Sequence, residues 1–174
     1  MRRVLAALAC VAAMPGAVRA EIASEVMFSH KHWQVEVVAF DDGSFACLAE
    51  VEAPGESFSI WTYQDESVKL QFHSTQWEFG EGETANLSIQ IDRRGPWALS
   101  NAELYQNSVL FDLPDSNAGV RFLLEVAQGN RLNLRTEAGE DVQWYSLAGS
   151  KASMQALIEC GEVIANSSPG NPFN

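Results

Sequence analysis

Apolar and polar residues alternate along much of the first half of the chain. In residues 33–39, Trp33, Val35 and Val37 alternate with more polar neighbours, and a period of two is typical of a strand with one buried face. A short polar turn, Asp41–Gly43, separates this run from the next one. Two alternating runs around a glycine-containing turn predict a β-hairpin. The same pattern predicts further strands at residues 44–52, 57–63, 68–74 and 86–92.

The pattern is less regular in other segments. Residues 80–85 (GEGETA) are polar and glycine-rich, and we predict a loop there. Residues 98–114 are compatible both with a short helical turn and with an alternating strand. Two more strands are predicted at residues 131–137 and 142–148, on either side of a polar turn.

A helix is predicted at residues 116–128. Asp115 or Ser116 can cap its start, and Gly129 can end it. Four apolar residues recur at the i, i+3, i+4 and i+7 spacing of one buried helix face, and they are Val120, Leu123, Leu124 and Ala127.

A second helix is predicted at residues 150–160. Gly149 would make the sharp turn that leads into it, and Ser150 would cap its free N–H groups. Gly161 suits a left-handed stop directly after the helix. The expected apolar face consists of Met154, Leu157 and Ile158.

Together these elements predict one β-rich α+β domain at residues 21–165. The expected architecture is an antiparallel sandwich or a barrel-like sheet with two short helices, at about 116–128 and 150–160. Residues 166–174 are polar and rich in proline and glycine, so we expect a flexible tail there.

The first twenty residues have the pattern of a secretory signal peptide. Arg2 and Arg3 precede an apolar run at residues 4–14, and small residues lead up to Ala20. We therefore expect cleavage after Ala20 and a periplasmic or secreted product. The apolar run is too short to span a bilayer, so no membrane span is predicted.

Charge narrows the range of partners. Removal of residues 1–20 would leave 8 basic and 23 acidic residues, a formal charge of −15. Binding to nucleic acid or to anionic lipid requires a basic surface, so both are disfavoured. A protein, small-molecule or glycan partner stays open, and the acidity is also compatible with a role in solubility alone.

Two cysteines remain after the expected cleavage, Cys47 and Cys160. Two cysteines in an exported chain most often form one structural bridge. Nothing in the sequence resembles the C-x-x-C pattern of a redox pair. We therefore predict a Cys47–Cys160 disulfide that ties an early strand to the last helix.

Residues 149–151 combine a glycine, a serine and a lysine at a predicted helix start. A serine–lysine acyl-transfer site needs the serine three residues before the lysine, and that position is Ala148. A catalytic serine is therefore not expected. Gly149, Ser150 and Lys151 remain a possible anion-binding helix start, because such an end presents free N–H groups.

Large aromatic residues provide the best binding hypothesis. Some of them fall opposite the apolar face of a predicted strand, where a row of exposed rings can bind a sugar, a peptide or a protein. The alternative is that a second layer of the fold covers them. The candidate aromatic binding face consists of Trp61, Tyr63 and Trp77.

Metal, cofactor and acid–base sites are not supported. His30 and His32 fall in a predicted flexible leader, His73 falls on a separate strand, and no H-E-x-x-H pattern is present. The paired carboxylates all fall in predicted turns, where aspartate and glutamate are solvated. These pairs are Asp41/Asp42, Asp65/Glu66, Glu81/Glu83 and Glu140/Asp141.

The layout resembles the invasion-associated locus B group of bacterial periplasmic proteins across residues 33–161. The shared features are the signal peptide, a W-x-V strand at Trp33–Val35, Cys47, an L-x-G at Leu147–Gly149 and a late cysteine. The resemblance implies a small, disulfide-bearing, β-rich export product without known catalytic residues. No site residue is carried over from it.

The expected function is therefore that of an exported, non-enzymatic binding or interaction protein. The ligand is not specified by the sequence. An alternative is an acidic inhibitor of a secreted hydrolase such as lysozyme, whose basic surface would suit this charge. A third possibility is a hydrolase whose catalytic residues are scattered along the sequence.

Overall fold

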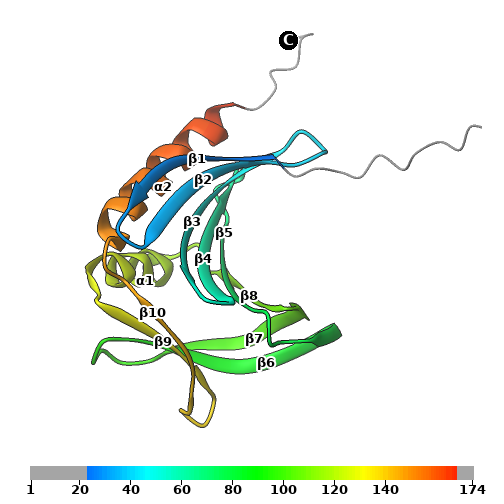
Figure 1. Cartoon of the computed structure of the whole chain (residues 1–174), viewed down its shortest axis with the longest axis vertical. Helices are drawn as coiled ribbons and strands as arrows, with labels where there is room; N and C mark the ends of the chain where they lie inside the picture. The colour runs from blue at the N-terminus through cyan, green and yellow to red at the C-terminus, as the bar shows by residue number, and fades with distance from the viewer. Residues whose placement is uncertain (1–22, 168–174) are drawn as a thin grey trace, which may run out of the picture.

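The computed structural model describes residues 23–167, which form ten strands and two helices (Figure 1). All strands belong to one antiparallel sheet in the order β1-β2-β3-β4-β5-β8-β7-β6-β9-β10. The predicted β-rich α+β class is confirmed. The strands are β1 (Ala23–His30), β2 (Trp33–Ala39), β3 (Phe45–Ala53), β4 (Glu56–Tyr63), β5 (Val68–Ser74), β6 (Phe79–Ile91), β7 (Trp97–Gln106), β8 (Ser108–Leu113), β9 (Arg131–Thr136) and β10 (Asp141–Ser146), and the helices are α1 (Asn117–Gln128) and α2 (Ser150–Asn166).

One face of the sheet carries the core. Successive side chains of a strand point to opposite faces, so the alternation in the sequence divides each strand into two sets of residues. The set that does not face the core lies on what we call the outer face. Cross-strand pairing aligns one core row across β2, β3, β4, β5 and β8, and all of its members are buried: Trp33, Val51, Phe58, Phe72 and Val109.

The sheet curls around this core without closing into a barrel. β1 and β10 are its two edges, and each pairs with one strand only. The curl brings β10 back toward β2 and β3, as Figure 1 shows. At this point the Trp33 indole Nε1 donates to the Ser146 carbonyl at 3.1 Å, which joins β2 to β10.

The helices pack on the core side of the sheet. α2 contacts β1, β2, β3 and β4, and α1 contacts α2 (Figure 1). Phe122 and Val126 of α1 are buried, as are Met154, Leu157 and Ile164 of α2. The two helices therefore complete a single core together with the sheet.

The predicted disulfide is present and buried. Cys47 on β3 and Cys160 on α2 are bonded across a sequence separation of 113. Cys47 is 0 % and Cys160 2 % exposed. The bridge fixes the last helix to a central part of the sheet, so the prediction from the cysteine content is confirmed.

Two segments differ from the prediction for the strands, and the alternative left open for a third is resolved. Residues 80–85, predicted as a loop, belong to β6, and the ambiguous segment 98–114 forms most of β7 and β8. His30 and His32 do not lie in a flexible leader, because His30 ends β1 and His32 lies in the turn to β2. The polar stretch of β6 is exposed on both faces, so it lacks the alternation that reveals a half-buried strand.

The predicted buried face of the first helix is right only for Leu123 and Ala127, which are half-buried against the core. Val120 and Leu124 are 59 % and 54 % exposed, whereas Phe122 and Val126 are buried. Apolar residues occur around much of this short helix, so more than one stripe fits the helical period. The ring of Phe122 packs edge-on against Trp97, at 5.6 Å between centroids, and this contact decides which stripe faces the sheet. Ser116 is the N-cap, but its side chain makes no capping hydrogen bond.

The second helix is longer than predicted and starts differently. It continues through Gly161 to Asn166 instead of ending at Cys160. A Cβ at Gly161 would lie 3.2 Å from Thr62 Cγ2, so this glycine allows close approach to β4 and does not end the helix. Of the predicted apolar face, Met154 and Leu157 are buried but Ile158 is 61 % exposed.

The predictions for the chain ends fall largely outside the described residues. This holds for the signal peptide at residues 1–20 and for residues 168–174 of the expected tail. Asn166, which we placed in the tail, is the last residue of α2. In residues 23–167, no helix has the length and hydrophobicity needed to cross a membrane.

Candidate functional site

Trp61 and Tyr63 lie side by side on the outer face of β4. Phe58 and Ile60 of the same strand face the core and are fully buried, so the alternation places Trp61 and Tyr63 on the opposite side. The two rings are nearly parallel, with an interplanar angle of 15° and 6.4 Å between centroids. Both side chains are half-buried. Two of the three predicted aromatic residues therefore form a common surface.

The two rings rest on small and aliphatic residues of β3. Trp61 pairs with Leu48, and Tyr63 pairs with Ala46. Leu48 is 7 % exposed and Ala46 is fully buried, although both lie on the outer face. Trp61 and Tyr63 thus have a structural function as well, and each keeps part of its ring accessible.

A hydrogen-bonded set of polar side chains surrounds Trp61. Its indole Nε1 donates to Gln71 Oε1 at 2.8 Å, and Gln71 Nε2 donates to Ser108 Oγ at 2.9 Å. On the other side, Ser59 Oγ donates to Glu50 Oε1 at 2.8 Å. These bonds hold the polar groups in fixed positions before any ligand arrives, which lowers the entropic cost of binding.

Two hollows flank the outer face. One, of about 560 Å³, is lined by Ser44, Phe45, Tyr63, Gln64, Asp65, Ser67, Lys69 and Asp112. The other, of about 330 Å³, is lined by Lys69, Ser100, Asn101, Glu103, Leu110, Phe111 and Asp112. Lys69 and Asp112 border both hollows and form an ion pair, with 3.0 Å between Nζ and Oδ1. The face is therefore hollowed on both sides, and charged side chains line both hollows.

Titratable groups near the first hollow are perturbed by their local surroundings. Burial raises the pKa of Tyr63 above its usual value, and the nearby Lys69 acts in the opposite direction. The pKa of Asp65 is lowered because the hydroxyl and backbone N–H of Ser67 donate to its carboxylate. Asp65 thus belongs to a turn, as predicted for this carboxylate, and its hydrogen bonds serve the geometry of that turn.

Trp77 does not belong to this surface. It lies in the turn between β5 and β6, and its ring packs against Phe79 at 5.6 Å between centroids. Its backbone carbonyl accepts a hydrogen bond from Asn107 Nδ2. The aromatic group predicted from the sequence is thus reduced to Trp61 and Tyr63 at this position. Because Trp77 lies outside the strands, strand alternation could not predict which face of the sheet it occupies.

Residues 149–151 form the junction between the two helices. Gly149 is the N-cap of α2 with a φ of 107°, a conformation that favours glycine. Ser150 is buried, and its Oγ donates to the Val126 carbonyl of α1 at 2.7 Å instead of capping its own helix. Its backbone N–H donates to Leu147, while Lys151 is exposed. Both donor groups of Ser150 are therefore used within the fold, and anion binding there stays a prediction.

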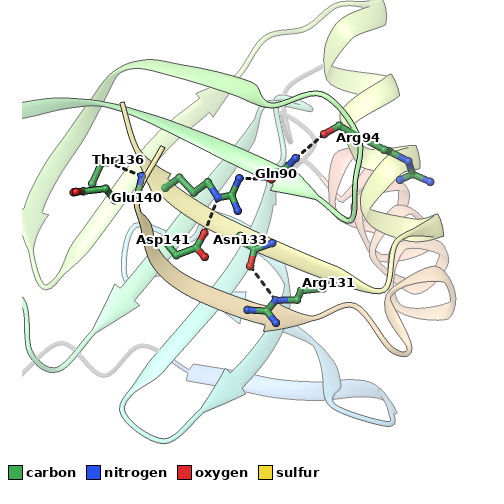
Figure 2. Close-up of polar contacts among 8 residues, drawn as sticks. Gln90, Arg94, Arg131, Asn133, Thr136, Glu140 and Asp141 are labelled. Atoms are coloured by element: carbon green, nitrogen blue, oxygen red, sulfur yellow. Dashed lines mark hydrogen bonds and ion pairs between the residues drawn. The ribbon is translucent and has the colours of Figure 1, made fainter. Parts of the chain in front are cut away.

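A second polar network covers the outer face of β6, β9 and β10 (Figure 2). Arg135 Nε donates to Asp141 Oδ1 at 2.6 Å, and its Nη1 donates to Gln90 Oε1. Arg131 Nε donates to Asn133 Oδ1 at 2.9 Å. The Arg131 guanidinium also lies over the Trp144 ring, 4.5 Å from its centroid. These contacts hold β10 to the sheet and orient Trp144, which is 57 % exposed.

The described residues do not form a metal site. No group of three or more histidine, cysteine, aspartate or glutamate side chains in residues 23–167 is arranged to hold an ion. Comparison with family models, curated proteins and solved structures gives no match.

Proposed function

We propose that this chain is an exported, non-enzymatic binding protein that holds a glycan on the outer face around Trp61 and Tyr63. Sugar rings present apolar C–H faces and a rim of hydroxyl groups. Aromatic rings match the first feature, and carboxylate, amide and hydroxyl groups match the second. The adjacent, nearly parallel rings of Trp61 and Tyr63 carry the proposal.

The surrounding polar groups suit an uncharged, hydroxyl-rich ligand. Gln71 and Ser108 already donate or accept within the network around Trp61, and Glu50 holds Ser59. Each carboxylate or hydroxyl oxygen has more than one lone pair, so it can accept from a ligand hydroxyl as well. A short run of sugar units would extend from the rings into the flanking hollows.

Two observations support the proposal that the chain is exported. The buried Cys47–Cys160 disulfide suits an oxidising compartment. The pattern of residues 1–20 suits a cleaved signal peptide. Membership of the invasion-associated locus B group is part of the same proposal, since that resemblance implies a disulfide-bearing, β-rich export product.

A glycan array comparing the wild type with two variants tests the proposal. We expect the wild type to retain a defined set of neutral glycans and Trp61→Ala to lose them, because the stacking surface is removed. Trp61→Phe should bind with reduced affinity, since it keeps a ring but loses the N–H that Gln71 accepts. Trp144→Ala is the matched control, because it removes an exposed ring on a different part of the sheet.

Two results would contradict glycan binding at this face. One is a wild-type protein that retains no glycan on the array. The other is a Trp61→Ala variant that is folded by circular dichroism and binds as the wild type does.

A second candidate function is inhibition of a basic secreted hydrolase such as lysozyme. The β2–β3 and β4–β5 turns lie at the same end of the sheet because of the antiparallel register. They present exposed carboxylates at Asp41, Asp42, Asp65 and Glu66. A basic enzyme surface is complementary to this end, so we expect inhibition of lysozyme at low salt that weakens at high salt. Lysozyme activity that is unchanged at low salt rejects this candidate.

A further inference from the structure

The curl of the sheet leaves a cleft where β10 approaches β3 and β4 without pairing with them. The cleft has a volume of about 460 Å³. It opens between β10, the β1–β2 turn and the β3–β4 turn, and it is separate from the face around Trp61. Its lining consists of His32, Val51, Glu52, Ala53, Pro54, Glu56, Trp144, Tyr145 and Ser146.

The cleft follows from how the sheet ends. β10 is an edge strand, and the Trp33–Ser146 hydrogen bond fixes one end of it to β2. β10 therefore approaches the opposite part of the sheet near Ser146 but forms no ladder with it, and a gap remains beside the β3–β4 turn.

The lining combines an apolar part with two carboxylates. Val51, Pro54 and the ring of Tyr145 provide apolar surface, and Trp144 adds an indole that is 57 % exposed. Glu52 and Glu56 lie on the same cleft. Within residues 23–167 neither of these two carboxylates forms an ion pair. Their negative charge is thus not neutralised by a side chain of the described fold.

The potential at this cleft is negative. Burial is the main reason that the pKa of Tyr145 is raised, and the charges of Glu56 and Glu50 raise it further. Of the two carboxylates that line the cleft, Glu56 therefore acts on the end where Tyr145 lies. The chain as a whole has a formal net charge of −12, which attracts cationic partners over longer distances.

Arg131 restricts where a cation can lie in the cleft. Its guanidinium lies over the Trp144 ring. Asn133 accepts a hydrogen bond from Arg131 Nε and holds the guanidinium in this position (Figure 2). A second cation on that side of the indole would be repelled. The favourable position for a positive charge is therefore beside Glu52 and Glu56, with the indole left to contact an apolar chain.

We propose that this cleft binds a basic side chain, arginine or lysine, of a protein partner. Both side chains have an apolar stem and a charged end. The stem would contact Trp144, Val51 and Pro54, and the charged end would pair with Glu52 and Glu56. This site does not depend on the proposed glycan binding, because the two involve different residues.

Heteronuclear NMR titration tests the site directly. The indole N–H signal of Trp144 is assigned by its loss in Trp144→Phe. The probe is N-acetyl-Gly-Arg-Gly amide, and the matched ligand replaces arginine by citrulline, which has nearly the same shape without the charge. We expect a saturable shift of the Trp144 signal with the arginine peptide, with millimolar affinity for so small a ligand, and no saturable shift with citrulline.

Charge variants connect the shift to the two carboxylates. Glu52→Gln/Glu56→Gln should weaken the arginine peptide by about tenfold, because both ion pairs are removed. Asp41→Asn/Glu66→Gln is the control, since it makes the same change in net charge at exposed turn residues at the other end of β3 and β4. The control should retain wild-type affinity apart from a small uniform decrease.

Several outcomes would overturn the proposal. Equal binding of citrulline would show that charge is not recognised, and equal loss in both double variants would show that only net charge matters. A Trp144 signal that responds to an oligosaccharide and not to the arginine peptide would assign the cleft to a glycan. Glycan binding that is lost in Trp61→Ala, together with an unaffected Trp144 titration, would leave this inference intact.

Discussion

Two serines at the helix starts differ in what their side chains do. Ser150 is 1 % exposed, and its hydroxyl donates to the Val126 carbonyl of the neighbouring helix. Ser116 is exposed at the N-cap of α1 and makes no capping hydrogen bond through its side chain. The position of a residue in a helix does not by itself fix the role of its side chain.

We therefore predict a large loss of stability for one alanine variant and a small change for the other. Ser150→Ala removes this buried hydrogen bond and leaves the Val126 carbonyl with only the Gly129 N–H, at 3.4 Å, and it should lower the free energy of unfolding by about 1 to 3 kcal/mol. Ser116→Ala should change it by less than about 0.5 kcal/mol, although N-cap substitutions usually cost about 1 kcal/mol. Urea denaturation of both variants measures the difference. An unchanged free energy of unfolding in Ser150→Ala would show that the contact with Val126 is unimportant.

The residues that sequence reasoning misplaced are those whose role depends on a distant neighbour. Ser150 fits a capping position by its spacing, but its hydroxyl bonds a carbonyl 24 residues away. Trp61 and Tyr63 could be placed on the outer face because strand alternation is a local property. Trp144 could not be singled out by a local pattern, since its cleft exists only once the sheet has curled.

At the level of the elements, the half-buried strands were the best predicted. β2, β4 and β5 have one face mainly in the core, so their sequences alternate, whereas β3 is buried on both faces around Ala46 and Leu48. Much of β6 is exposed on both faces and shows no such pattern. In α1 the sequence allows several apolar stripes, and the tertiary contact of Phe122 with Trp97 selects one of them. Periodicity thus predicts an element only where the surroundings differ between its faces.

The placement of α1 depends on a close approach at Gly119. This residue is buried at the start of the helix, and a Cβ there would lie 2.3 Å from the Pro114 carbonyl oxygen. The obstacle is backbone, which cannot rotate away as a side chain can. Gly119→Ala should therefore displace the start of α1, even though alanine has a higher helix propensity than glycine.

We predict that Gly119→Ala lowers the free energy of unfolding by about 2 kcal/mol or more, as expected for overpacking. Gly95→Ala is the control, because a Cβ at Gly95 would have no atom within 4 Å. That variant should be neutral or slightly stabilising. Thermal unfolding followed by circular dichroism compares the two. A Gly119→Ala protein as stable as the wild type would contradict the tight packing of α1 on the residues before it.

At the scale of the whole molecule, the general class was predictable and the shape was not. Alternation and two cysteines led to a β-rich domain with one bridge, and both features are present. The strand order depends on long-range pairing, because β9 comes back to pair with β6. The gap beside β10 depends on the same pairing. The cleft lined by Glu52, Glu56 and Trp144 is a product of that pairing, so no local pattern could indicate it.

The Cys47–Cys160 bridge should be reducible only when the whole domain opens. Both sulfur atoms are buried between β3 and α2, so a reductant reaches them only after α2 has left the sheet. Closing a loop across 113 residues stabilises the fold by roughly 4 to 5 kcal/mol in the chain-entropy description. We therefore expect reduction by dithiothreitol to be slow in buffer and to accelerate with urea as the domain unfolds. Alkylation of the freed thiols and mass spectrometry measure the rate of reduction.

The double variant Cys47→Ala/Cys160→Ala should unfold at a markedly lower urea concentration than the wild type. Rapid reduction without urea, at unchanged circular dichroism, would show instead that α2 detaches locally while the sheet remains folded.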